Sequence, residues 1–199
     1  MSSDRVKFLV KESLKLFLQE GIRGMPIGEL SRRLGVSTKT LYQHFGDKPG
    51  LVRACVRLYR ANSLKLYQES SEGASDSAEV LVRFHHQQVS RLLRTHPAFF
   101  RDIAYYLAEE NEKRGLLGEQ ETRELLVRGQ SEGLFQQNID PEIAASTLTL
   151  LMEAIFEGQR FSGHGTRELM TQVLWPYWRG LCTSQGLDAF RAHREEYFK

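Results

Sequence analysis

Apolar residues recur at three- and four-residue spacing along almost the whole chain, which is the period of amphipathic helices. No run of about four to eight residues alternates cleanly between apolar and polar positions, as a half-buried strand would. The first apolar stripe consists of Phe8, Val10, Leu14, Phe17 and Leu18. The pattern predicts an all-α protein.

Glycine, proline and capping residues divide this pattern into successive helices. The first helix is predicted to end at Glu20, and the others to cover residues 26–34, 38–45, 48–68, 76–95, 97–111, 116–132, 140–160, 166–186 and 187–197. Pro176 lies inside the second-to-last of these helices and should kink or break it. The polar stretch 70–75 is the clearest linker.

Residues 27–45 have the spacing of a helix-turn-helix, in which a short turn joins two helices. Ile27, Leu30 and Leu34 would form the inner face of the first helix, and Leu41 and Phe45 that of the second. The turn needs a residue that accepts a left-handed conformation, and a small apolar residue to pack beneath it. Gly35 and Val36 meet these two requirements.

The second helix of this motif would present polar side chains on a short rigid rod of the size that enters a DNA major groove. The outward residues are Ser37, Thr38, Lys39, Thr40, Tyr42 and Gln43. Gln43 suits an adenine edge, whereas Tyr42, His44 and Lys48 lie near the helix end and suit phosphates. Arg32 and Arg33 add positive charge, so binding should weaken steeply with salt.

The pattern Val36-Ser37-x-x-Thr40-Leu41-Tyr42-x-His44-Phe45-x-x-Lys48-x-x-Leu51, preceded by a helix and a Gly21-Ile22 turn, resembles the DNA-binding domain of the TetR family of repressors. The resemblance covers about residues 4–60 and is only architectural beyond them. It implies DNA contacts from Ile27, Gly28, Ser37, Thr38, Lys39, Thr40, Tyr42, Gln43, His44 and Lys48. Members usually have a Thr or Ser capping the second helix and touching a phosphate, where this chain has Met25-Pro26-Ile27.

Charge divides the 199 residues into two parts that the formal net charge of +2 conceals. Residues 1–60 hold 12 of the 27 basic and 5 of the 25 acidic residues, a net charge of +7, and the remainder carries −5. This asymmetry predicts two modules with different partners. We expect a DNA-binding domain over residues 1–60 and an effector-binding and dimerisation domain over residues 61–199.

The helices predicted near residues 140–160 and 166–186 are apolar on more than one side, so a second face needs a partner. A second subunit is the economical partner, and the TetR resemblance implies a four-helix interface between subunits. The residues expected there are Leu148, Met152, Ile155, Val173, Leu174, Tyr177, Trp178 and Leu181. An effector pocket is expected among the helices predicted between residues 76 and 160, with His86, Phe100, Tyr106, Met152 and Phe156 as its candidate residues, although core packing is the alternative for each aromatic.

Other chemistry leaves no signature in the sequence. There is no phosphate-binding glycine loop, nucleophile elbow or paired catalytic motif, so neither a catalytic residue nor a cofactor is predicted. His85 and His86 are adjacent and point about 100° apart on a helix, so they cannot chelate one ion, and no metal site is predicted. Cys55 and Cys182 lie in apolar patterns and are expected to be buried reduced thiols.

The N-terminus carries charges every few residues, unlike a secretory signal, and the most apolar stretch, 148–156, is too short to span a bilayer. We therefore expect a cytoplasmic protein with no membrane partner. The expected function is transcriptional repression by a homodimer on a near-palindromic double-stranded DNA operator, with release by an unidentified small-molecule effector. The alternatives are an activator or effector-independent regulator of the same fold, and a helical enzyme or small-molecule-binding protein with a vestigial basic domain.

Overall fold

The computed structural model of the chain describes residues 3–107, 116–156, 161 and 163–197. These residues form helices and no strand, apart from one isolated antiparallel bridge between Phe135 and Cys182. The predicted all-α class is therefore confirmed. None of the described helices is both long and apolar enough to cross a membrane.

The chain divides into two compact units, and the division differs from the expected one in a single respect. The first unit contains residues 1–62 together with 94–116, and the second contains residues 63–93 and 117–199. A segment that begins 34 residues beyond the expected boundary at residue 60 thus belongs to the same unit as the N-terminal helices.

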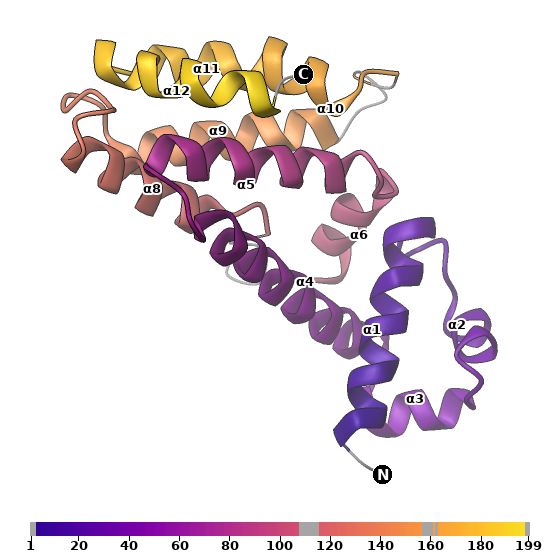
Figure 1. Ribbon diagram of the computed structural model, residues 1–199. Helices are drawn as coiled ribbons and strands as arrows, with labels where there is room; N and C mark the ends of the chain where they lie inside the picture. The colour runs from indigo at the N-terminus through magenta and orange to yellow at the C-terminus, as the bar shows by residue number, and fades with distance from the viewer. Residues whose placement is uncertain (1–2, 108–115, 157–160, 162, 198–199) are drawn as a thin grey trace. The chain divides into compact units, whose positions relative to one another are not determined.

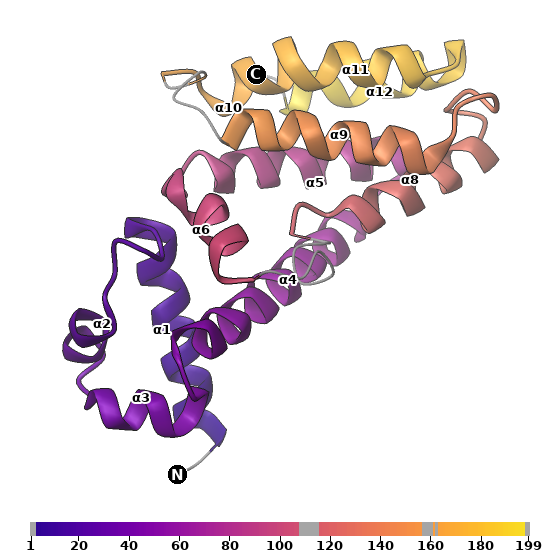
Figure 2. The same cartoon turned by 180° about the vertical axis from the view of Figure 1, so that it is seen from behind.

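The first unit consists of α1 (Ser3–Glu20), α2 (Ile27–Arg33), α3 (Thr38–Phe45), the start of α4 (Lys48–Ser71) and α6 (Ala98–Tyr106) (Figure 1). Its core includes Leu9, Phe17, Ile22, Leu30, Leu41, Val52 and Tyr59, all 1% exposed or less. Figure 2 shows α6 beside α1, and the two helices are in contact. Of the apolar stripe expected on α1, Leu14 and Phe17 are buried, whereas Phe8 is 52% exposed and Leu9 is buried in its place.

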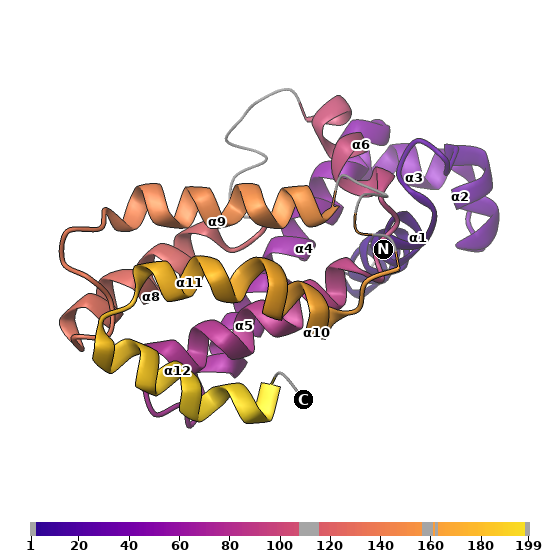
Figure 3. The same cartoon turned by 90° about the horizontal axis from the view of Figure 1, so that it is seen from above.

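The second unit contains the end of α4, α5 (Ser77–Leu92), α8 (Glu119–Ser131), α9 (Pro141–Phe156), α10 (Thr166–Leu169), η2 (Met170–Leu174), α11 (Trp175–Leu181) and α12 (Ser184–Tyr197). The nearly unexposed helix α5 contacts α8, α10 and α12, and α9 contacts α8 and η2. Figure 3 shows α9 and α11 lying side by side. Asp76 caps α5 by accepting the backbone N–H of Glu79 at 2.8 Å.

Pro176 produces the irregularity that was expected in the helix that contains it. Residues 170–174 form a π-helical turn, in which the N–H of Trp175 reaches Met170 O, and α11 begins at Trp175. Because proline has no N–H, the ordinary i→i−4 bond cannot form at Pro176, and the wider turn accommodates this. Helical geometry then continues to Leu181.

The helix expected to end near residue 186 instead stops at Leu181. Leu181 O accepts the N–H of Gln136 at 3.0 Å, and Thr183 N–H donates to Leu134 O at 2.9 Å. This pairing takes backbone groups that the helix would have used. Thr183 Oγ1 then accepts the N–H of Gly186 at 3.1 Å, so that α12 begins earlier than the sequence indicates.

Both cysteines are buried and free, as expected. Burial raises the pKa of the Cys182 thiol to about 12 and also raises that of Cys55, so both thiols stay protonated at neutral pH.

Candidate nucleic-acid interface

A helix-turn-helix connects α2 to α3. The turn begins at Gly35, whose φ of +65° is the left-handed conformation that favours glycine. Val36 N–H donates to Ser31 O at 3.0 Å, and Gly35 N–H donates to Arg32 O at 3.2 Å, which closes the end of α2. Leu30 and Leu41 are buried beneath the turn. These bonds fix the turn from which α3 leaves, and α2 and α3 are in contact.

Helix α3 presents nearly all of its side chains outward, because Leu41 is its one buried residue. Thr38, Lys39, Tyr42 and Gln43 are exposed, and Tyr42 is 46% exposed although it is aromatic. The helix is only eight residues long. Such a short rod with donors and acceptors on its open side has the dimensions of a helix that enters the major groove.

Ser37 caps α3. Its Oγ accepts the backbone N–H of Thr40 at 3.1 Å, and its hydroxyl lies 2.9 Å from Thr40 Oγ1. The two hydroxyls therefore hold the first turn of α3 in shape while they remain at the surface. Any contact of the Ser37 and Thr40 hydroxyls with a phosphate would therefore be made from the first turn of α3.

Helix α2 begins without a side-chain cap. Pro26 stands at the N-cap position and makes no side-chain hydrogen bond there. Ile27 is half-buried and Gly28 is exposed. The start of α2 therefore offers backbone groups and no side-chain hydroxyl, as the sequence indicates.

Arg32 and Arg33 are already engaged by carboxylates. Arg32 donates both Nε and Nη2 to Glu29, and Arg33 donates Nε to Glu29 at 3.0 Å and also pairs with Glu20. Hydrogen bonds from Arg32 and then Arg33 lower the pKa of the Glu29 carboxyl. These ion pairs offset part of the positive charge that was expected to favour DNA.

His44 and Lys48 are placed differently from the other expected DNA contacts. Nε2 of His44 is buried and has no hydrogen-bond partner among the described residues. Lys48 Nζ donates to Ile22 O at 2.7 Å and to Met25 O at 2.8 Å, and it lies 5.3 Å from the centroid of the Tyr106 ring. The Lys48 ammonium therefore points into the first unit rather than out from it.

Helix α6 supplies partners that no sequence motif indicates. The Asp102 carboxylate accepts the backbone N–H of Arg23 at 2.8 Å, across 79 positions of sequence. The guanidinium of Arg23 lies 4.9 Å from the centroid of the Tyr105 ring, and His96 N–H donates to Leu18 O at 2.7 Å. Only the folded chain brings these residues together, because neither their spacing nor their type is distinctive.

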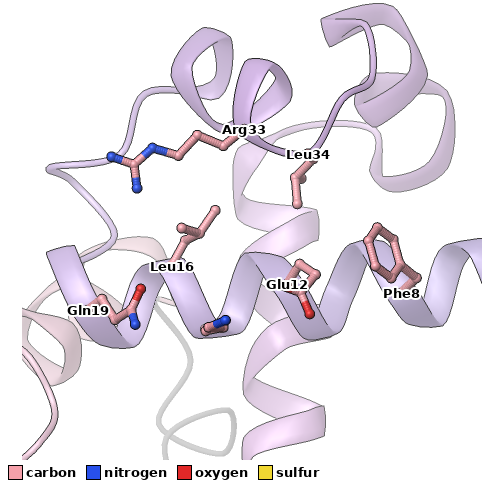
Figure 4. Close-up of a pocket in the computed structure, with 7 residues that line it drawn as sticks. Phe8, Glu12, Leu16, Gln19, Arg33 and Leu34 are labelled. Carbon is pink, nitrogen blue, oxygen red and sulfur yellow. The ribbon is translucent and has the colours of Figure 1, made fainter.

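A hollow of about 440 Å³ lies between α1 and α2, as Figure 4 shows. It is lined by Phe8, Glu12, Lys15, Leu16, Gln19, Arg33 and Leu34. Its charged groups have both signs, so its lining shows no preference for an anion such as phosphate. The hollow therefore adds nothing to the surface that α3 presents.

The residues expected at a dimer interface are mostly inside the second unit. Leu148, Met152, Ile155, Leu174, Trp178 and Leu181 are at most 8% exposed. Val173 and Tyr177 are half-buried, and the Tyr177 hydroxyl donates to Ala144 O at 2.7 Å. The burial of these six side chains within one protomer accounts for part of the apolar stripe, because such a stripe looks the same in sequence whether it meets its own core or a partner.

The expected effector residues are distributed over both units. Phe100 and Tyr106 belong to the first unit, where the Phe100 ring packs edge-on against Tyr59 at 5.7 Å between centroids. His86 and Met152 belong to the second unit, in which Met152 is buried and burial lowers the pKa of half-buried His86. The side chain of Phe156 is outside the described residues.

Comparison with known proteins agrees with this geometry. Residues 9–55 match the family model for bacterial regulatory proteins of the tetR family. No curated protein is similar enough to the chain to count as a match. Among solved structures, a TetR-family transcriptional regulator from Rhodococcus sp. is similar with a TM-score of 0.69 and 22% identity, over 88% of this chain and 97% of that one.

Two further solved structures share the fold. The ketosteroid transcriptional regulator KstR2 of Mycobacterium tuberculosis has a TM-score of 0.64 and 16% identity, over 92% of this chain and 97% of that one. NalD of Pseudomonas aeruginosa, the secondary repressor of the MexAB-OprM multidrug efflux pump, has a TM-score of 0.62 and 20% identity, over 92% of this chain and all of that one. Residues 9–55 therefore match the tetR family of bacterial regulatory proteins, and the chain shares the fold of solved regulators of that family.

Proposed function

We propose that the chain is a homodimeric repressor that inserts α3 of each subunit into the major groove of a near-palindromic operator. The observation that carries this proposal is the outward face of α3, where Thr38, Lys39, Tyr42 and Gln43 are exposed and Leu41 alone is buried. The remaining proposed contacts are Ile27, Gly28, Ser37, Thr40 and His44. Of these, His44 has a buried Nε2. Two such helices held by a dimer would read two half-sites about one helical turn or more apart.

Gln43 is the residue from which we expect sequence specificity. A glutamine side chain can bond two groups on the edge of an adenine, and such a pair discriminates against other bases by about 1–3 kcal/mol. Replacing Gln43 with Ala should weaken operator binding about 10- to 100-fold and leave binding to unrelated DNA almost unchanged. Fluorescence anisotropy with labelled duplexes from the DNA upstream of the gene would measure both affinities.

Gln68→Ala provides a matched control, since Gln68 is also an exposed glutamine within a helix but lies in the second unit. It should bind the operator like the natural chain. Equal losses in the two variants, or salt-insensitive binding by the natural chain, would contradict the proposal.

We further propose that a small, largely apolar effector binds the second unit and favours a form that no longer fits the operator. The supporting observation is a set of buried polar atoms there, Gln88 Oε1 and Trp178 Nε1, that have no hydrogen-bond partner among the described residues. Buried polar groups are nearly always satisfied, by protein, water or ligand. An effector can release DNA only by binding the DNA-incompetent form better, typically by about 1–3 kcal/mol.

A thermal-shift screen followed by anisotropy would test the effector. We expect at least one compound that raises the melting temperature and also releases the operator. If no compound does both, an effector-independent regulator is the better description. Reporter expression that rises when the regulator is present would identify an activator in place of a repressor.

A further inference from the structure

Lys48 is the first residue of α4, and its ammonium group binds partners inside the first unit. Two of its three N–H groups donate to Ile22 O and Met25 O, at 2.7 and 2.8 Å. The ammonium also lies 5.3 Å from the centroid of the Tyr106 ring, within cation–π range. The two carbonyls and the ring together hold the ammonium inside the first unit, away from an external phosphate.

The charge balance around Lys48 agrees with an internal role. The carboxylate of Asp102, a residue only 3% exposed, attracts the ammonium, while burial lowers the pKa of Lys48. The two carbonyls are in the α1–α2 turn, and Ile22 and Met25 are themselves fully buried. Moving the ammonium outward would leave these carbonyls short of a donor, at the usual cost for buried polar groups.

Helix α6 makes further contacts with the same turn. Asp102 accepts the backbone N–H of Arg23, and Tyr105 packs against the guanidinium of Arg23. We use the term turn clasp for Lys48, Asp102, Tyr105 and Tyr106. Together these four residues fix the backbone from Ile22 to Met25, and α2 begins two residues later at Ile27.

We infer that Lys48 is a positioning residue, which fixes the α1–α2 turn and thereby the placement of the helix-turn-helix, and that it does not bind a DNA phosphate. The inference rests on DNA binding through α3, as proposed above. Its consequence is that removing the Lys48 charge should damage the fit to the operator without removing a counterion-releasing contact.

The salt dependence of DNA affinity separates these two roles. Each lysine that neutralises a phosphate contributes about −0.9 to the slope of log K against log salt concentration. We expect Lys48→Met to bind the operator about tenfold more weakly with the slope of the natural chain, and to keep its affinity for unrelated DNA. The matched variant Lys39→Met removes an exposed lysine on α3 and should make the slope shallower. A shallower slope for Lys48→Met would overturn the inference.

Tyr106→Leu tests the clasp while leaving the Lys48 charge in place. If Lys48 positions the turn, this half-buried substitution should also weaken operator binding with an unchanged slope. If Lys48 instead binds phosphate, freeing it from the ring should leave operator affinity unchanged or raise it, which would overturn the inference. All affinities are to be measured well below the melting temperature of each variant, so that the folded fraction does not differ.

A measurement without DNA distinguishes failure of this inference from failure of the proposed function. Losses in unfolding free energy should be non-additive between Lys48→Met and Tyr106→Leu, because both remove the same contact. Additive losses would overturn the clasp whatever the chain does on DNA. Non-additive losses in a chain that binds no DNA would overturn the proposed function alone.

Discussion

At the scale of single residues, His85 is enclosed by the core of the second unit. The residue is 1% exposed, its Nδ1–H donates to Leu81 O at 2.9 Å, and its Nε2 lies 3.4 Å from Thr122 Oγ1. Because a carbonyl can only accept, Nδ1 must carry the proton, and Nε2 is then an acceptor in the neutral ring. Burial lowers the pKa of His85 to about 4.

This lowered pKa predicts how the stability of the second unit depends on pH. Between about pH 6.5 and 4 the unfolded chain binds a proton at His85 and the folded chain does not, so the free energy of unfolding falls as pH falls. Above about pH 6.5 both states are neutral and the contribution is fully present. Between pH 7 and pH 5 we expect His85 to account for a loss of about 2 kcal/mol.

Urea unfolding of the natural chain and of His85→Leu at pH 7 and pH 5 would measure the loss. The leucine variant has no titrating group at this position, so its stability should fall less over the same interval. Parallel losses in the two proteins would show that other groups cause the acid sensitivity.

At the scale of elements, we expect the start of α3 to combine folding and DNA binding in one side chain, that of Ser37. Ser37→Ala removes the cap on Thr40 N–H and should cost about 1 kcal/mol of unfolding free energy. Ser37→Asp keeps an acceptor at this position and should restore most of that stability, yet its carboxylate would face DNA phosphates and abolish operator binding. Chemical denaturation and anisotropy on both variants would measure the two effects. Recovery of DNA binding in Ser37→Asp would exclude contact between the start of α3 and the phosphate backbone.

Elements whose boundaries depend on local chemistry could be predicted from the sequence. The helix-turn-helix depends on Gly35, Ser37 and the spacing of Leu30 and Leu41, all within a few turns of each other. The break after Leu181 could not be predicted, because its cause is pairing with residues 134–136, which are more than forty positions away. Likewise, Lys48 fits a phosphate-binding pattern, and only the distant α6 explains why its ammonium turns inward.

At the scale of the whole molecule, the surface proposed to join two subunits is the outer face of α9 and α11. Ile143 is 66% and Leu150 63% exposed, although both are apolar, and they share a helix face with Thr147 and Ala154. On the neighbouring segment, Val173 of η2 and Pro176, Tyr177 and Gly180 of α11 also recur at three- and four-residue spacing, and they are exposed or half-buried. Two such faces would form a four-helix interface related by a two-fold axis.

The substitution Leu150→Glu would place a carboxylate within this interface. Burying an unpaired carboxylate there is strongly unfavourable. We expect this variant to be a folded monomer by sedimentation velocity. Its operator binding should be far weaker than that of the natural chain. A monomer presents one α3 and loses the second half-site. Leu64→Glu is the matched control, since Leu64 is 45% exposed on α4 and should tolerate the charge without dissociation. A Leu150→Glu protein that remains a dimer would place the subunit interface on another face.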